Sequence, residues 1–145
     1  MFKRILLPTD GSELSSRAVL AGVSFAKEVG AQLVGVTALP DFKTFTADAE
    51  QLESTEDEYL AASEVRANKR LAPIVDAARS AGVDCTVLLV RSNAPHDAIL
   101  RTARERGCDL IIMASHGRHG LSGVLLGSET QKVLVHSSIP VLVYR

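Results

Sequence analysis

The sequence predicts an α/β fold in which one open, parallel sheet of five strands carries helices on both faces. Short apolar runs alternate with longer segments whose apolar residues recur at helical spacing, which is the pattern of a parallel sheet with crossover helices. The 145 residues suit a single domain, spanning 1–145, that buries a sizeable core. A glycine-rich stretch follows the fourth apolar run and marks a loop in which the backbone can approach a ligand closely.

The five apolar runs are the expected strands. Each run is short, rich in leucine or β-branched residues, and bounded by turn-forming or polar residues. The strands are expected at residues 4–8, 32–38, 84–90, 110–114 and 140–144.

The first helix is expected over residues 12–29. Its apolar residues follow one another at alternating steps of four and three, which places them on one stripe of a helix. Gly30 stands where helices commonly end, and Gly22 inside the segment lowers helix propensity without breaking the stripe. The stripe consists of Leu14, Ala18, Ala21, Phe25 and Val29.

Two further helices are expected before the fourth strand. The segment 40–59 is rich in Asp, Glu and Thr and is expected to be a long connection that leads into a helix over residues 54–81. Pro73 lies inside that helix and is expected to kink or split it, because proline lacks a backbone donor. The next helix is expected to open at Pro95 and to end at Gly107. Its inward residues are expected to be Ala98, Ile99, Thr102 and Ala103.

The glycine-rich stretch contains Gly117 and Gly127 and lies between the fourth strand and the last helix. A strand, a glycine loop and a helix N-terminus in this order gather backbone N–H groups around an anion, for which phosphate is the natural guest. Several loop positions are expected to need positive φ angles. Ser128 is expected to cap the last helix, with Gln131 completing the capping box. A glycine loop with a purely structural role is the alternative.

Neither standard phosphate-binding motif is present. No lysine follows Gly127, so the Walker pattern does not match. The first strand ends in Pro8-Thr9-Asp10-Gly11-Ser12, which is not the G-x-G-x-x-G dinucleotide fingerprint.

Two separated blocks of the chain resemble the universal stress protein family. The ATP-binding members of that family carry G-x-x-G, nine residues, then G-[ST]. Gly117, the nine residues 118–126, Gly127 and Ser128 match this pattern in type and spacing, whereas Ala114 stands where the pattern has its first glycine. The other block is the end of the first strand, and the resemblance covers nearly the whole chain.

This resemblance implies a Rossmann-like sheet of order 3-2-1-4-5. In such a sheet the order reverses between strands 1 and 4, and ligands bind outside the strand ends at that switch point. The first-strand loop and the glycine loop both leave those two strands and would meet in one crevice. The resemblance implies an adenine nucleotide there, with contacts from Pro8, Thr9, Asp10, Ala38, Met113, Ala114, Gly117, Arg118, Gly127, Ser128, Glu129 and Thr130.

Three of these residues have more specific roles. The carboxylate of Asp10 is expected to meet Mg²⁺ or Mn²⁺ carried by the phosphates of ATP, since hard cations prefer oxygen ligands. The alternative for Asp10 is an Asx-turn or a cap on the first helix. Arg118 offers a charged fork to phosphate. Met113 either flanks the base or ribose or belongs to the core.

The expected function is regulatory ATP binding without catalysis. Attack on a γ-phosphate requires a placed water, an orienting group or base and a countering cation, and the glycine loop contains no lysine. One alternative is a slow ATP hydrolase or phosphotransfer enzyme of the same fold. Another is a dimeric stress protein that binds no nucleotide, which Ala114 leaves open.

Composition, charge and apolar runs predict the binding partners and the cellular location of the protein. A net charge of −1 gives no general attraction to nucleic acid or acidic membranes. No run reaches membrane-spanning length and the N-terminus lacks the apolar stretch of a signal peptide, so a cytoplasmic location is expected. The apolar strand between Ile139 and Tyr144 would lie at the sheet edge, which predicts a homodimer through this strand.

Overall fold

The computed structural model describes residues 1–42, 52–117 and 126–145, and for residues 52–55 it describes the backbone alone. The elements follow in the order β1 (Arg4–Pro8), α1 (Glu13–Val29), β2 (Gln32–Leu39), α2 (Leu52–Ala81), β3 (Cys85–Arg91), α3 (Pro95–Glu105), β4 (Leu110–Ala114), α4 (Ser128–His136) and β5 (Val141–Tyr144).

The strands form one parallel, five-stranded sheet of order β3-β2-β1-β4-β5. β1 lies at the centre, where Leu6 is opposite Val34 of β2 on one side and Ile111 of β4 on the other. This order is the predicted one, and every strand boundary agrees with the prediction to within one residue. The order reverses between β1 and β4, and in open parallel sheets ligands bind outside the carboxyl ends of the strands at such a switch point.

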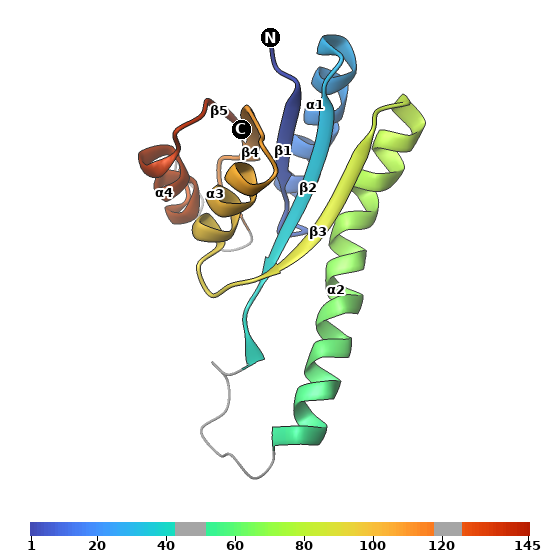
Figure 1. Ribbon diagram of the computed structural model, residues 1–145, viewed down its shortest axis with the longest axis vertical. Helices are drawn as coiled ribbons and strands as arrows, with labels where there is room; N and C mark the ends of the chain where they lie inside the picture. The colour runs from blue at the N-terminus through green and yellow to red at the C-terminus, as the bar shows by residue number, and fades with distance from the viewer. Residues whose placement is uncertain (43–51, 118–125) are drawn as a thin grey trace.

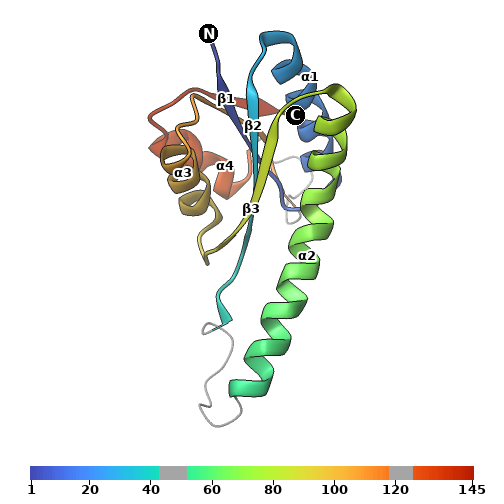
Figure 2. The same ribbon diagram turned by 45° about the vertical axis from the view of Figure 1, so that its right-hand side comes forward.

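Helices cover both faces of the sheet (Figures 1 and 2). α1 and α2 lie on one face, whereas α3 and α4 lie on the other. Successive strand residues point to opposite faces, so Ile5 and Leu7 of β1 join the cluster under α1 and α2, and Leu6 joins the cluster under α3. None of the helices that the structure describes combines the length and apolar content needed to cross a membrane.

α1 buries a face that is shifted by one residue from the predicted stripe. Val29 of that stripe is 39% exposed. The shift has a steric reason, because a β-carbon at Gly22 would overlap Leu7 Cδ2; the absence of a side chain at Gly22 lets the helix lie close to β1. The buried residues of α1 are Ser15, Ala18, Val19, Gly22, Val23 and Ala26.

α2 is one continuous helix of 30 residues, so Pro73 does not split it, which was one of the two predicted outcomes. The proline removes one backbone hydrogen bond, but Leu71 and Ile74 on either side of it are 4% and 0% exposed against the sheet. This packing stabilises the helical conformation across the proline. The first turns of α2 project beyond the sheet (Figure 1). For α3 the predicted inward residues, Ala98, Ile99, Thr102 and Ala103, are all buried.

Candidate functional site

A cavity of about 560 Å³ opens at the carboxyl ends of β1, β2 and β4. It lies at the switch point of the sheet, and its volume is in the range of small-molecule sites. All predicted site residues that the structure describes line this cavity, whereas Arg118 lies outside the described residues. These lining residues are Pro8, Thr9, Asp10, Ala38, Met113, Ala114, Gly117, Gly127, Ser128, Glu129 and Thr130.

Asp10 forms the Asx-turn that the sequence offered as one of its two roles, and it also lines the cavity. Its Oδ1 accepts the backbone N–H of Ser12 at 2.9 Å, which closes an Asx-turn. Its other oxygen, Oδ2, lies against Gly117 at the cavity. The helix cap belongs to Ser12, whose hydroxyl accepts the Ser15 N–H at 3.2 Å. The Asx-turn therefore fixes one carboxylate oxygen and leaves the other beside the glycine loop.

Gly127, rather than Ser128, is the N-cap residue of α4, and no side chain caps this helix. The predicted capping box is therefore wrong. Gln131 is directed elsewhere, because its Nε2 donates to the carbonyl oxygen of Leu126 at 3.0 Å. Ser128 is thus the first helical residue, and its hydroxyl is not used as a cap.

The two loop glycines are needed for close packing and not for unusual backbone angles. Neither Gly117 nor Gly127 has a positive φ, and Gly127 has φ −68°; the other two glycines for which the prediction was made, Gly120 and Gly123, lie outside the described residues. A β-carbon at Gly127 would lie 3.1 Å from His116 Cα, which is tighter than ordinary contact, and one at Gly117 would overlap Asp10 Oδ2. Glycine therefore lets the two ends of the loop and the β1 turn approach one another.

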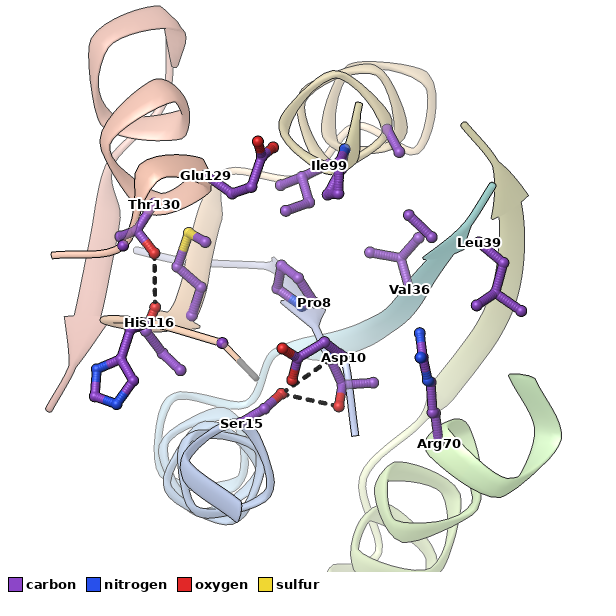
Figure 3. A pocket seen from close by; sticks show the side chains of 18 of the residues that line it. Pro8, Asp10, Ser15, Val36, Leu39, Arg70, Ile99, His116, Glu129 and Thr130 are labelled. Atoms are coloured by element: carbon purple, nitrogen blue, oxygen red, sulfur yellow. Dashed lines mark hydrogen bonds between the residues drawn. The ribbon is translucent and has the colours of Figure 1, made fainter. Parts of the chain in front are cut away.

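Hydrogen bonds attach the start of α4 to the end of β4. The Gly127 N–H donates to the Ser115 carbonyl oxygen at 2.7 Å. The Thr130 hydroxyl, which is buried, donates to the Ala114 carbonyl oxygen at 3.0 Å (Figure 3). The first N–H groups of any α-helix have no carbonyl partner within it. Those of α4 belong to Ser128 and its neighbours, which line the cavity and suit an anion there.

Glu129 connects the N-termini of α3 and α4. Its Oε2 accepts the His96 backbone N–H at 2.7 Å and lies 2.9 Å from His96 Nδ1, and its Oε1 accepts from Lys132 Nζ at 3.2 Å. Partial burial acts to raise the pKa of Glu129, but these hydrogen bonds together outweigh burial and hold the pKa below its usual value of 4.5. The side chain caps α3, whose N-cap residue Ala94 forms no side-chain cap bond.

Sequence reasoning missed the apolar wall of the cavity and its α2 side. Ala98 and Ile99 had been predicted only as core residues, yet they also face the cavity. The buried face of β2 was the available signal for the apolar wall. No sequence pattern predicts that residues of α2 reach the cavity, because a long connection precedes that helix and leaves its position relative to the strand ends undefined. The missed residues are Ser15, Val36, Leu39, Pro40, Arg66, Arg70, Pro95, Ala98, Ile99 and His116.

The described residues could hold a metal here together with a phosphate ligand. Across residues 1–42, 52–117 and 126–145, no three His, Cys, Asp or Glu side chains gather as a metal site requires. Asp10 contributes one carboxylate at the cavity. This donor set fits Mg²⁺, which commonly takes one or two carboxylates together with substrate phosphates and water.

Comparison with known proteins gives a consistent result. The family model described as the universal stress protein family matches residues 1–145. Universal stress protein YxiE of Bacillus subtilis is 33% identical over 149 aligned positions that include all of both chains.

Solved structures agree with the observed sheet. The structure of MJ0577, a universal stress protein of Methanocaldococcus jannaschii, superposes with a TM-score of 0.85 at 29% identity, covering 99% of this chain and 96% of that chain. A universal stress protein crystallised in complex with cAMP superposes with a TM-score of 0.71 at 27% identity, covering 99% and 97%.

Proposed function

The chain belongs to the universal stress protein family, and we propose that it binds an adenine nucleotide, with ATP and Mg²⁺ as the expected pair, in the cavity between β1 and β4. The observation that carries this proposal is the meeting of Asp10, Gly117 and Gly127 at one cavity of about 560 Å³. A magnesium-bound polyphosphate needs glycine backbone that it can approach closely, helix N-terminal N–H groups that bind its oxygens, and a carboxylate that binds the metal.

The lining of the cavity supports a division into two regions. Pro8, Ala38 and Met113 provide small or apolar surface for a purine base, and the backbone at Gly127 and Ser128 provides the phosphate region. A relative of the same fold and 27% identity was crystallised with cAMP, which supports an adenine nucleotide as the ligand class.

The proposed role of the nucleotide is regulatory. The cavity residues that the structure describes include no lysine, and Asp10 is already engaged by the Ser12 N–H. We therefore expect sustained phosphate release from Mg-ATP well below the ~1 s⁻¹ typical of slow enzymes. Phosphate release at several per second that disappears in Asp10→Ala would instead establish the hydrolase alternative.

Analysis of the ligand carried by the purified protein tests the proposal. Protein prepared without added nucleotide is denatured, and the released small molecules are identified by mass spectrometry. We expect an adenine nucleotide. Finding none, together with no uptake of added Mg-ATP, would support the alternative of a stress protein that binds no nucleotide.

A further inference from the structure

Ser15 lies in the first turn of α1 and reaches the cavity beside Asp10 (Figure 3). The residue is only 3% exposed. Its hydroxyl donates to Thr9 Oγ1 at 2.9 Å and accepts the backbone N–H of Asp10 at 3.3 Å. Because a buried polar atom that loses its partner is costly, these two bonds fix the hydroxyl between the end of β1 and the turn that follows.

Side-chain oxygens occupy the backbone N–H groups of this turn. The Gly11 N–H donates to Thr9 Oγ1 at 3.1 Å. The Ser12 N–H donates to Asp10 Oδ1 at 2.9 Å, and the Asp10 N–H donates to Ser15. Anion-binding turns instead direct successive N–H groups at the ligand. Three consecutive N–H groups of the β1 turn are thus engaged within the turn itself.

The start of α4 differs from this turn. At α1 the Ser12 hydroxyl caps the helix by accepting the Ser15 N–H at 3.2 Å, whereas Gly127 begins α4 without a side-chain cap bond. Helix N–H groups without such a partner suit phosphate, and carboxylate oxygens suit Mg²⁺. The α4 side of the cavity therefore favours an anion, and the β1 turn favours a cation.

Two hydrogen bonds set the position of Asp10. Ser15 holds its backbone N–H, and the Ser12 N–H holds its Oδ1. The other oxygen, Oδ2, lies against Gly117 at the cavity. Without Ser15 Oγ, the Asp10 N–H loses this partner and its peptide group can turn toward the cavity, which moves the carboxylate.

We propose that Ser15 is a positioning residue, which holds Asp10 for the metal ion of a bound metal–nucleotide complex and keeps the β1 turn closed to phosphate. This inference rests on the proposed function and adds the residue that makes binding there depend on the metal. The Ser15 hydroxyl acts through Asp10 and Thr9, to which it is bound, and not through a contact of its own with the metal.

Calorimetric titration of ATP, once with Mg²⁺ and once with EDTA, tests the inference. We expect Mg²⁺ to tighten ATP binding to the natural protein about 5-fold or more. Ser15→Ala should weaken binding of Mg-ATP about 3- to 5-fold, as the loss of one buried hydrogen bond does. It should change binding of ATP in EDTA by less than about 2-fold. The ratio of the two affinities reports the positioning of Asp10, whereas a general loss of structure would lower both.

Ser16→Ala is the matched control. It removes a hydroxyl from the same turn of α1, where Ser16 donates to the Ser12 carbonyl oxygen at 3.0 Å, and Ser16 is not among the described residues that line the cavity. The effect of Mg²⁺ should stay unchanged in this variant. In an Asp10→Ala background, Ser15→Ala should change the affinity for Mg-ATP by less than about 2-fold, because both changes act on one carboxylate.

Thr9→Val and Thr9→Ser provide a second test if Ser15→Ala does not fold. Thr9 Oγ1 accepts from Ser15, so valine removes this bond at a similar side-chain shape, whereas serine retains the hydroxyl. Thr9→Val should reduce the effect of Mg²⁺ more than Thr9→Ser does. Thermal unfolding identifies the variants that fold.

The outcomes separate this inference from the proposed function. An unchanged effect of Mg²⁺ in Ser15→Ala, an equal loss with Mg²⁺ and with EDTA, or an equal reduction in Ser16→Ala overturns the inference, and the proposed function stands. If the natural protein binds ATP equally well with Mg²⁺ and with EDTA, the inference is overturned and nucleotide binding stands without the metal. If ATP binds in neither condition, the proposed function fails and the inference fails with it.

Discussion

Asp10 and Gly117 meet where β1 and β4 end, so closely that a β-carbon on Gly117 would overlap Asp10 Oδ2. The two residues lie far apart in the chain and come together only because β1 and β4 are neighbours in the sheet. The absence of a side chain at Gly117 thus leaves room for the carboxylate that the Asx-turn holds.

Gly117→Ala is expected to displace the Asp10 carboxylate and to weaken Mg-ATP binding about 5- to 10-fold, equivalent to about 1 kcal/mol. Asp10→Ala should weaken binding by a similar factor. Because both changes act on one carboxylate, the double variant should lose little more than either single variant. Calorimetric titration of all three provides the comparison, and fully additive losses would show that Gly117 acts independently of Asp10.

The contact between Glu129 and His96 should make stability depend on pH. The pKa of Glu129 is lowered in the folded protein, so its contribution is fully present above about pH 4.5 and disappears as the pH falls through the lowered value. At neutral pH, Glu129→Gln is expected to lower the free energy of unfolding by no more than about 1 kcal/mol, since the side chain is partly exposed. The difference from the natural protein should shrink in acid.

Urea unfolding at pH 7 and near pH 3 measures this difference. Glu105→Gln is the control, because Glu105 is an exposed residue of α3 that takes part in none of the ion pairs seen among the described residues. A Glu129→Gln difference that is equally large at both pH values would show that the ionised carboxylate is not what stabilises the two helix ends.

β5 lies at an edge of the sheet, and we propose that a homodimer forms through it, since an uncovered edge strand invites pairing. Leu142 of β5 is 41% exposed. Leu142→Asp should therefore leave the monomer folded while placing a charge in the interface. Light scattering at micromolar concentration is expected to give a dimer mass for the natural protein and a monomer mass for the variant.

Leu20→Asp is the control for the dimer, because Leu20 is a 60% exposed leucine of α1 and not part of the edge strand β5. It should leave the dimer intact. A monomer mass for the natural protein, or an unchanged dimer in Leu142→Asp, would contradict pairing through this edge.

Much of the fold is predictable from the sequence because the strands are buried. Apolar runs such as residues 110–114 identify the strands by themselves. The order of the sheet was predicted from the resemblance to the universal stress protein family, which rests on the glycine loop and the end of the first strand. The face of α1 was not predictable to the residue. Its position depends on Gly22 lying against Leu7, which is a contact between two elements and leaves no periodic signal.

The site was predictable where it follows directly from the strand ends. Asp10 and Gly127 lie within a few residues of β1 and α4, so topology brings them together. The role of Ser128 was mistaken because the pattern S-x-x-Q is the same whether or not the serine adopts the cap position. Arg66 and Arg70 were missed because only the tertiary placement of α2 turns them toward the cavity.

Calorimetric titration of Mg-ATP into the natural protein and Gly127→Val tests the central claim most directly. The φ of −68° at Gly127 is open to valine, but a β-carbon would be pressed 3.1 Å from His116 Cα, and the branched side chain would occupy the loop that is proposed to hold phosphate.

We expect the natural protein to bind Mg-ATP and Gly127→Val to bind at least about 10-fold more weakly, equivalent to about 1.4 kcal/mol. Ser128→Ala is the stability control, because Ser128 does not cap α4 and its loss should change the unfolding free energy by less than about 0.5 kcal/mol. Equal affinity of the natural protein and a folded Gly127→Val variant would contradict a phosphate site at this loop.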